Sequence, residues 1–264
     1  MTIHVGIGGW TFAPWRGVFY PKGLPQAREL AYAAEHLSSI EINGTFYRTQ
    51  SPASFTKWAS EVPKGFVFAL KGPRYATHRK PLAEAGPSIE RFLASGPLTL
   101  GDKLGPMLWQ FAPFTKFDPD DFGAFLALLP AERDGRRLRH VVEARHPSFS
   151  DPRFIALLRE HKVANAIVES DKHALAEDLT ADFVYARLER AQADEATGYP
   201  KKDLDRWAKR IGEWAAGREP ADAKRLSDKP AAKANTRDCF IYFISGAKER
   251  NPAAAMAMIE RLGR

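Results

Sequence analysis

The sequence predicts an α/β fold in which residues 1–264 form a single (β/α)8 barrel of the TIM type. Eight short apolar runs end in turn signals, and helix-like stretches lie between most of them. The length of 264 residues is close to the roughly 250 residues of such barrels. Alternating strands and helices imply parallel strands joined by helical crossovers. The sequence therefore favours one barrel domain.

The eight predicted strands are short runs rich in apolar residues. They cover residues 3–8, 38–43, 65–71, 105–111, 139–145, 163–169, 182–188 and 239–245. An open, doubly wound sheet more often has five or six strands, and it carries a Gly-rich phosphate loop. The segment "GIGGW" lacks the later glycine of that motif. The closed barrel is therefore preferred, and no nucleotide cofactor is indicated.

Each predicted helix follows one of these strands. They are "PASFTKWASEV", "PSIERFLASG", "PDDFGAFLALL", "DPRFIALLREH", "KDLDRWAKRIGEWAAG" and "NPAAAMAMIERL". Several begin with Asp, Ser or Asn beside Pro, which is the usual chemistry of a helix start. The connection after the sixth strand, "DKHALAEDLT", is short. We therefore expect the barrel to be irregular around strands 6 to 8.

The composition predicts a folded cytoplasmic protein that does not bind membranes. The chain is 44% hydrophobic and 27% charged, which allows a large core beneath an ordinary charged surface. Its first residues lack a signal-peptide pattern, and no run approaches the roughly 20 apolar residues that span a bilayer. Cys239 is the only cysteine, which excludes an internal disulfide and a thiolate metal cluster.

The net charge of +7 favours partners that carry phosphate. Residues 201–237 hold eleven Lys or Arg and six Asp or Glu, so most of the excess lies in this segment. We favour the interpretation that it is a solvated surface of a helix and a loop. The alternative is a surface that binds nucleic acid.

Polar residues gather at the ends of the predicted strands. Alternate residues of a strand share a face, so a polar residue two positions beyond an inward apolar residue also points inward. Applied to six strands, this rule directs inward Glu41, Asn43, Lys71, Gln110, Glu143, Arg145, Glu169, Asp171, Tyr185 and Arg187. In a (β/α)8 barrel, sites are built at the carboxyl ends of the strands. We expect the functional site there.

The charges of this set suggest roles. Glu41 and Glu143 are candidates for a general acid, a general base or a metal ligand. Lys71, Arg145 and Arg187 are candidates for holding an anionic group of the substrate. A desolvated Lys71 is also a candidate for a Schiff base, although no other feature of the sequence specifies that chemistry.

Histidines offer weaker signals. No two of them have the i, i+4 spacing of a helical zinc motif. His78 and His146 follow predicted strands, so each is a candidate proton carrier or ligand as well as an ordinary surface histidine. Whether a divalent metal binds is left open.

Two further segments lie next to strand ends. "SGAKERNP" places Lys248 and Arg250 before the last helix, where a phosphate site or a capped loop is expected. "WTFAPWRGVFYP" holds five aromatic residues, which form either a hydrophobic plug, the interpretation we favour, or a surface that stacks on a base or sugar.

Five segments give the chain a family resemblance along its whole length. "GIGGW", "EINGTFYRT", "LKGPRYATH", "LGPMLWQFAP" and "VVEARHPSF", in this order, resemble the YecE-like family, also described as domain of unknown function 72, whose fold is a TIM-type barrel. The polar residues that this resemblance marks as shared are Glu41, Asn43, Tyr47, Lys71, Thr77, His78, Gln110, Glu143, Arg145, His146, Asp171, Tyr185 and Arg187. The family's function is uncharacterised, so the resemblance implies no reaction.

The chain departs from the family pattern near its last two barrel strands. "YARLER" stands where the family commonly continues with His-Gly, and "FISGAKER" stands where it commonly has Phe-Asn-Asn. If those groups belong to the family's site, these departures imply a changed substrate or a weakened activity.

We expect an enzyme that acts on a small anionic, phosphate-bearing ligand by acid/base chemistry at the carboxyl end of the barrel. The expected catalytic residues are Glu41, Lys71, Glu143 and His146. The expected substrate-binding residues are Asn43, Tyr47, His78, Gln110, Arg145, Asp171, Tyr185 and Arg187. The alternatives are a metal-dependent barrel similar to phosphodiesterases or sugar isomerases, and a non-catalytic binder of nucleic acid or of a phosphometabolite.

Overall fold

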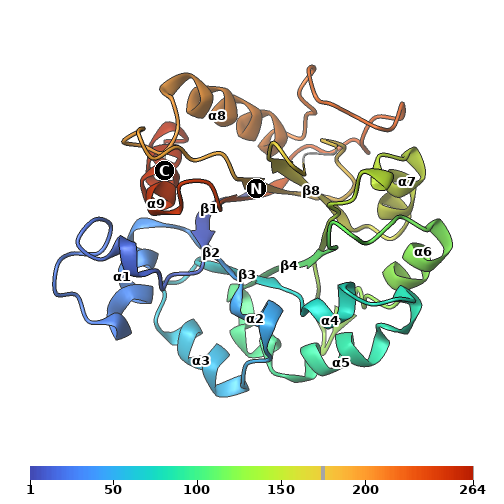
Figure 1. The fold of residues 1–264 in the computed structure, drawn as a ribbon, viewed down its shortest axis with the longest axis horizontal. Coiled ribbons are helices and arrows are strands. Elements are labelled where there is room, and N and C mark those ends of the chain that lie inside the picture. Colours follow the sequence, from blue (N-terminus) through green and yellow to red (C-terminus); the bar gives the residue numbers. More distant parts are fainter. Residues whose placement is uncertain (174–175, 264) are drawn as a thin grey trace.

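The computed structural model describes residues 1–173 and 176–263, and eight parallel strands within these residues form a closed barrel (Figure 1). The strands are β1 (Ile3–Gly8), β2 (Ser39–Ile42), β3 (Val67–Lys71), β4 (Leu104–Gln110), β7 (His140–Glu143), β8 (Ala164–Glu169), β9 (Phe183–Leu188) and β10 (Asp238–Phe243). Each pairs with the next barrel strand along the chain, and β10 pairs with β1. The predicted (β/α)8 barrel is confirmed.

Helices surround the barrel (Figure 1). The α-helices are α1 (Glu29–His36), α2 (Gly44–Tyr47), α3 (Pro52–Ser60), α4 (Arg74–Thr77), α5 (Gly86–Ala94), α6 (Pro119–Ala127), α7 (Pro152–Glu160), α8 (Lys201–Ala215) and α9 (Asn251–Arg261). Short 3-10 turns lie at Ala13–Trp15, Gln26–Arg28, Leu82–Glu84, Pro97–Lys103, Pro147–Phe149 and Lys248–Arg250. All six predicted helices are present. Helix α1 and the short helices α2 and α4, which directly follow β2 and β3, were not predicted.

Side-chain caps explain where several helices begin. Ser51, Asp118 and Asp151 stand just before α3, α6 and α7, and each side chain accepts a hydrogen bond from a backbone N–H of the first turn. Proline occupies the first turn of all three helices, where its missing N–H costs no helical hydrogen bond.

A small hairpin precedes β7. Strands β5 (Glu132–Arg133) and β6 (Arg136–Arg137) pair antiparallel. Between them Asp134 and Gly135 have positive φ angles of 52° and 71°, as a tight primed turn requires. The Asp-Gly pair is the residue signal for this turn, although the hairpin was not predicted.

The expected irregularity lies between β8 and β9. The described residues of this connection, 170–173 and 176–182, form turns and no helix. Strand β7 pairs with β8 only through Val141 with Ala164 and Val142 with Asn165, so the two strands separate toward their carboxyl ends. The short connection predicted this departure from regular βα units.

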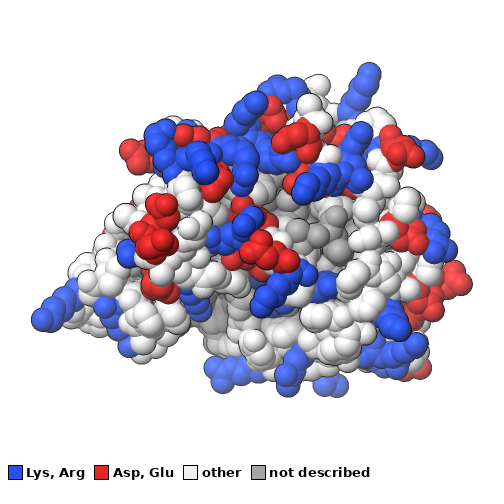
Figure 2. Space-filling view, turned by 45° about the horizontal axis from the view of Figure 1, so that its top comes forward, with Lys and Arg blue, Asp and Glu red and all other residues white. Residues whose placement is uncertain are grey.

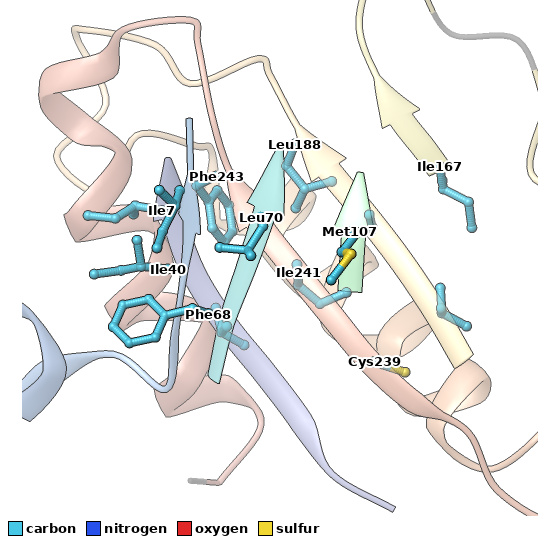
Figure 3. Packing of buried hydrophobic residues seen from close by; sticks show 14 of the residues in the cluster. Ile7, Ile40, Phe68, Leu70, Met107, Ile167, Leu188, Cys239, Ile241 and Phe243 are labelled. Atoms are coloured by element: carbon cyan, nitrogen blue, oxygen red, sulfur yellow. The ribbon is translucent and has the colours of Figure 1, made fainter. Parts of the chain in front are cut away.

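The larger part of the core lies between the barrel and the helices. Ile7, Ile40, Leu70, Met107 and Phe243 are among the buried side chains on the outer face of the strands (Figure 3). These residues alternate with inward residues, as expected for strands covered by helices. The buried side chains of the helices and those on the outer face of the strands therefore form one continuous apolar layer.

The interior of the barrel is apolar at its amino-terminal end. Phe183, Tyr185, Phe240 and Tyr242 fill it together with small and aliphatic residues from the facing strands. Close packing there also requires Gly6, because a Cβ at this position would lie 1.9 Å from the carbonyl oxygen of Ser39. Glu41, Lys71, Glu143 and Arg187 lie beyond this apolar filling, toward the carboxyl end.

No helix in the described part of the chain is both long enough and apolar enough to cross a membrane.

Candidate active site

The carboxyl ends of five strands direct polar side chains into the barrel, as the alternation rule predicts. The buried members of this set come from β2, β3, β4, β7 and β9: Glu41, Lys71, Gln110, Glu143 and Arg187. Each follows an inward residue two positions earlier, such as Ala69 before Lys71 and Val141 before Glu143. Five strands thus bring together groups that are far apart in the sequence.

The prediction for the sixth strand was wrong. On β8 the inward residues are Ala164, Ala166 and Val168, so Glu169 points outward. The Glu169 carboxylate accepts a hydrogen bond from the indole of Trp207 on α8 at 2.8 Å. The phase was misassigned because β8 is apolar on both faces, which removes the alternation signal.

Asp171 lies outside the buried set for the same reason. It is exposed on the loop after β8, and its carboxylate lies 3.4 Å from the guanidinium of Arg190.

Arg187 lies at the centre of the buried network. Its Nε and Nη2 donate to the two oxygens of Glu41 at 3.1 and 3.2 Å, and its Nη1 donates to Glu143 at 2.5 Å. Tyr185 donates to the same Glu41 at 2.6 Å. Burial opposes the charge on Arg187, but Glu143 and Glu41 outweigh it and raise its pKa well above the ordinary value. Arg187 is therefore a permanent cation.

Glu143 is fully buried and its two oxygens are both engaged. One accepts from Gln110 at 2.8 Å and from Arg145 at 2.6 Å, and the other accepts from Arg187. Burial alone would raise its pKa, but the Arg187 and Arg145 guanidiniums lower it to about 2. Glu143 therefore stays ionised throughout the physiological range.

Sequence reasoning missed Glu189. Its carboxylate accepts from Arg187 at 3.0 Å and lies 3.8 Å from Arg145. Burial raises its pKa even though Arg187 opposes the shift. The signal was available, because Glu189 continues the inward phase of Tyr185 and Arg187 one step beyond the end of β9. It lies within "YARLER", where the chain departs from the family pattern.

Lys71 differs from the two arginines because its ammonium group forms no ion pair within 4.0 Å among the described residues. It lies instead over the ring of Phe46, with 4.2 Å from Nζ to the ring centre. Burial lowers its pKa to about 8, and the nearby Arg187 guanidinium adds to the effect. Near neutral pH the amine is thus close to its own protonation midpoint.

A cavity of about 730 Å³ opens above these residues. The cations that line it are Arg48, Lys71, Arg145, Arg187 and Lys248. Within the described chain no Asp or Glu lines it, because Glu41 and Glu143 lie beneath the guanidiniums. The surface that a ligand would meet is therefore positive, although the buried network beneath it contains charges of both signs.

The other predicted binding residues occupy different places. Asn43 and Tyr47 line the cavity, and Tyr47 is 65% exposed. His78 packs edge-to-face against Phe46 at 5.3 Å between ring centres, and burial together with Lys71 lowers its pKa. His146 is not among the lining residues. Its Nδ1 accepts from the backbone N–H of Ser148 and caps the turn at 147–149.

The aromatic segment "WTFAPWRGVFYP" contributes side chains both to the core and to the cavity lining. Trp15, Phe19 and Tyr20 are buried and pack edge-to-face or tilted against one another. They form a hydrophobic plug, which is the favoured interpretation of this segment of the sequence. Trp10 is the exception, since it is only partly buried and lines the cavity.

The "SGAKERNP" segment lies at the edge of the cavity. Ser245, Lys248 and Asn251 line it. The Lys248 ammonium lies over the rings of Phe12 and Trp15, and burial lowers its pKa. Phosphate binding at this segment stays a prediction.

The described side chains do not fit a metal centre. Among residues 1–173 and 176–263, no group of three His, Cys, Asp or Glu side chains is placed to hold a metal ion. The carboxylates nearest the cavity, Glu41, Glu143 and Glu189, all accept hydrogen bonds from Arg187. The metal-dependent alternative therefore has no donor set in the described part of the chain.

Four of the eleven basic residues in 201–237 make ion pairs with described residues: Lys201, Arg206, Arg210 and Arg225. Arg210 donates to both Glu177 and Asp222 at 2.5 Å, and Arg206 lies 3.3 Å from Glu169. Lys and Arg side chains are interspersed with Asp and Glu side chains over the upper part of the surface in Figure 2. This arrangement fits the interpretation of a solvated surface better than that of a phosphate-tracking surface.

One known protein matches part of the sequence, and two solved structures match the whole fold. The UPF0759 protein YunF of Bacillus subtilis (strain 168) is 28% identical over 117 residues, which are 42% of this chain and 40% of that protein. A DUF72 family protein from Thermotoga maritima MSB8 has a TM-score of 0.77 at 20% identity, with both chains covered completely.

A DUF72 family protein from Enterococcus faecalis V583 has a TM-score of 0.70 at 16% identity, covering 100% of this chain and 98% of the other. At these identities the structural likeness establishes the barrel. The sequence profile described as "Protein of unknown function DUF72" matches residues 4–264. The chain with the Arg187-centred network therefore belongs to the DUF72 family.

Proposed function

We propose that this protein is an enzyme that binds a small phosphate-bearing anion in the cavity and transfers protons there through Lys71. The observation that carries the proposal is that the charged groups lining the cavity, within the described residues, are all cations. In a site sheltered from water, such groups attract an anion more strongly than on an open surface. The cavity volume of about 730 Å³ suits a small metabolite.

Lys71 is the group best suited to proton transfer. The guanidiniums of Arg145 and Arg187 are held by carboxylates, whereas the Lys71 ammonium contacts the Phe46 ring. A pKa of about 8 supplies both the neutral amine, which is a base, and the ammonium, which is an acid. A side chain with such a pKa in a cleft is a functional candidate on physical grounds.

We propose a positioning role for Glu41 and Glu143 in place of the acid/base role that the sequence suggested. Both carboxylates are fully buried, and both accept hydrogen bonds from Arg187. Because the Arg187 and Arg145 guanidiniums lower the pKa of Glu143 to about 2, its carboxylate is a weak base near neutral pH and is poorly suited to proton transfer. Its contribution is to orient Arg187 and Arg145 toward the ligand. His146, which caps a turn, has no proposed catalytic role.

The test combines binding and proton exchange. Phosphate and a panel of phosphorylated sugars and acids would be screened by the shift in Tm, and each ligand found would be incubated in D2O and followed by NMR. We expect the wild-type protein to exchange a substrate proton or form a product, with a rate that rises through a pH near 8. Lys71→Met should lose this activity, and Lys71→Arg should bind the ligand without turnover.

Lys64→Met is the matched control, because Lys64 is exposed just before β3, at the opposite end of the strand from Lys71. Full activity in Lys71→Met would overturn the role of Lys71. Binding without any exchange or product would instead identify a non-catalytic binder of phosphometabolites.

A further inference from the structure

The cavity has an aromatic wall as well as its cations. Trp10 follows β1, Tyr47 ends α2 and Trp58 lies on α3, and all three line the cavity. The Trp10 and Trp58 rings meet edge-to-face, 5.2 Å apart at 76°. These residues follow the neighbouring strands β1 and β2, whereas Arg145 and Arg187 come from β7 and β9 across the barrel. The aromatic side chains therefore lie on the side of β1 and β2, with Arg48 and Lys248 near them, and face Arg145 and Arg187 across the cavity.

The exposure of this wall is unusual for the chain. Of the six tryptophans, Trp15, Trp109, Trp207 and Trp214 are buried. Trp10 and Trp58 are only partly buried, and Tyr47 is 65% exposed. Large aromatic side chains left accessible beside a cavity are typical of a ligand site, since packing alone would bury them.

A buried oxygen atom without a donor among the described residues also lies at the cavity. Asn251, at the start of α9, is 1% exposed and lines the cavity, yet its Oδ1 accepts no hydrogen bond from the described residues. A buried carbonyl oxygen without a donor costs free energy, so a ligand hydroxyl or amine that donates to it would be favoured. Gln50 and Thr11 add further polar side chains to the lining.

We propose that the ligand of this cavity is a nucleotide, whose phosphate contacts Lys71, Arg145 and Arg187 and whose base lies against Trp10, Tyr47 and Trp58. The sugar between them supplies a hydroxyl group that donates a hydrogen bond to the Asn251 Oδ1. This assignment rests on the proposed phosphate-binding function, and it adds the aromatic base and the sugar. Stacking on aromatic side chains contributes about 1–3 kcal/mol per base, which corresponds to roughly 5- to 150-fold in affinity.

Calorimetric titrations with adenosine 5′-monophosphate, ribose 5-phosphate, 4-nitrophenyl phosphate and inorganic phosphate would test the proposal. We expect adenosine 5′-monophosphate to bind at least about tenfold more tightly than ribose 5-phosphate. Tyr47→Ala and Trp58→Leu should each remove most of this difference and leave ribose 5-phosphate binding unchanged. Tyr75→Ala is the matched control, because Tyr75 is an exposed tyrosine outside the lining, and this change should have no effect.

The outcomes separate this proposal from the proposed function. Equal affinities for adenosine 5′-monophosphate and ribose 5-phosphate would overturn the base site and leave the phosphate site intact. Equal affinities for 4-nitrophenyl phosphate and the nucleotide would show that any aryl phosphate suffices, and would overturn the nucleotide assignment. If none of the four probes binds, both the nucleotide and the phosphate site are wrong.

Discussion

The guanidinium of Arg187 and the carboxylate of Glu41 form a bidentate pair across the barrel, with N–O distances of 3.1 and 3.2 Å. Arg187 lies on β9 and Glu41 on β2, which are not neighbours in the barrel. The same guanidinium donates to Glu143 on β7. One side chain therefore joins three strands, and removing it leaves two buried carboxylates without their principal cation.

Arg187→Met should destabilise the protein by about 3–5 kcal/mol, because removing one member of a buried ionic network leaves uncompensated charge. Urea unfolding followed by circular dichroism would measure the change. Arg206→Met is the control, since Arg206 is half exposed and its pairs with Glu169 and Asp203 lie at the surface. Equal losses in the two variants would contradict the central role of Arg187.

Glu143 should make the protein sensitive to acid. Its folded-state pKa of about 2 lies below the ordinary value of 4.5, so its contribution is present above pH 4.5 and is lost as the pH falls toward 2. The loss should be on the order of 3 kcal/mol. In Glu143→Gln the unfolding free energy should be lower at pH 7 and should fall less between pH 5 and pH 3. Glu35→Gln, on the exposed side of α1, should retain the wild-type slope.

Lys71 should make the free energy of unfolding increase as the pH rises through the alkaline range. Its folded-state pKa of about 8 lies below the ordinary 10.5, so between these values the unfolded chain binds more protons and stability rises with pH. The rise should be on the order of 3 kcal/mol. Lys71→Met should be more stable than the wild type at pH 7 and should lack the rise. Urea unfolding at pH 7, 8, 9 and 10 would measure it, and a wild-type curve without this rise would argue against a desolvated amine.

Two glycines should respond oppositely to alanine. A Cβ at Gly6 would lie 1.9 Å from the Ser39 carbonyl oxygen, so β1 and β2 would have to separate. Gly6→Ala should destabilise the protein by at least about 1–3 kcal/mol. Gly212 lies inside α8 with open space around the added Cβ, so Gly212→Ala should stabilise by roughly 0.5–1 kcal/mol. Thermal unfolding of both variants would measure the contrast.

The sequence was sufficient to predict the barrel and most of the buried polar set, because alternation along a strand fixes which residues share a face. Glu41, Lys71, Glu143 and Arg187 are brought together as predicted. The prediction failed for Glu169, because a strand that is apolar on both faces shows no alternation from which the inward face can be assigned.

Roles were harder to predict than positions. The sequence shows that Glu143 and Lys71 approach the same place, but not that two guanidiniums occupy the carboxylate while the amine lies over an aromatic ring. Those partners depend on distances of a few ångströms between separate strands. Trp58 of the aromatic wall escaped prediction for the same reason, because it lies on a helix whose face toward the cavity is set by packing.

The apolar filling at the amino-terminal end of the barrel has a kinetic consequence. Phe183 and Phe240 close the interior there, with His4 stacked on Phe240 and Arg139 over both phenylalanine rings. The cavity is therefore closed toward the amino-terminal end of the barrel and has its entrance at the carboxyl end. Any ligand that enters must leave by the same route, so a product that keeps the phosphate would obstruct the next substrate, and turnover would show competitive product inhibition.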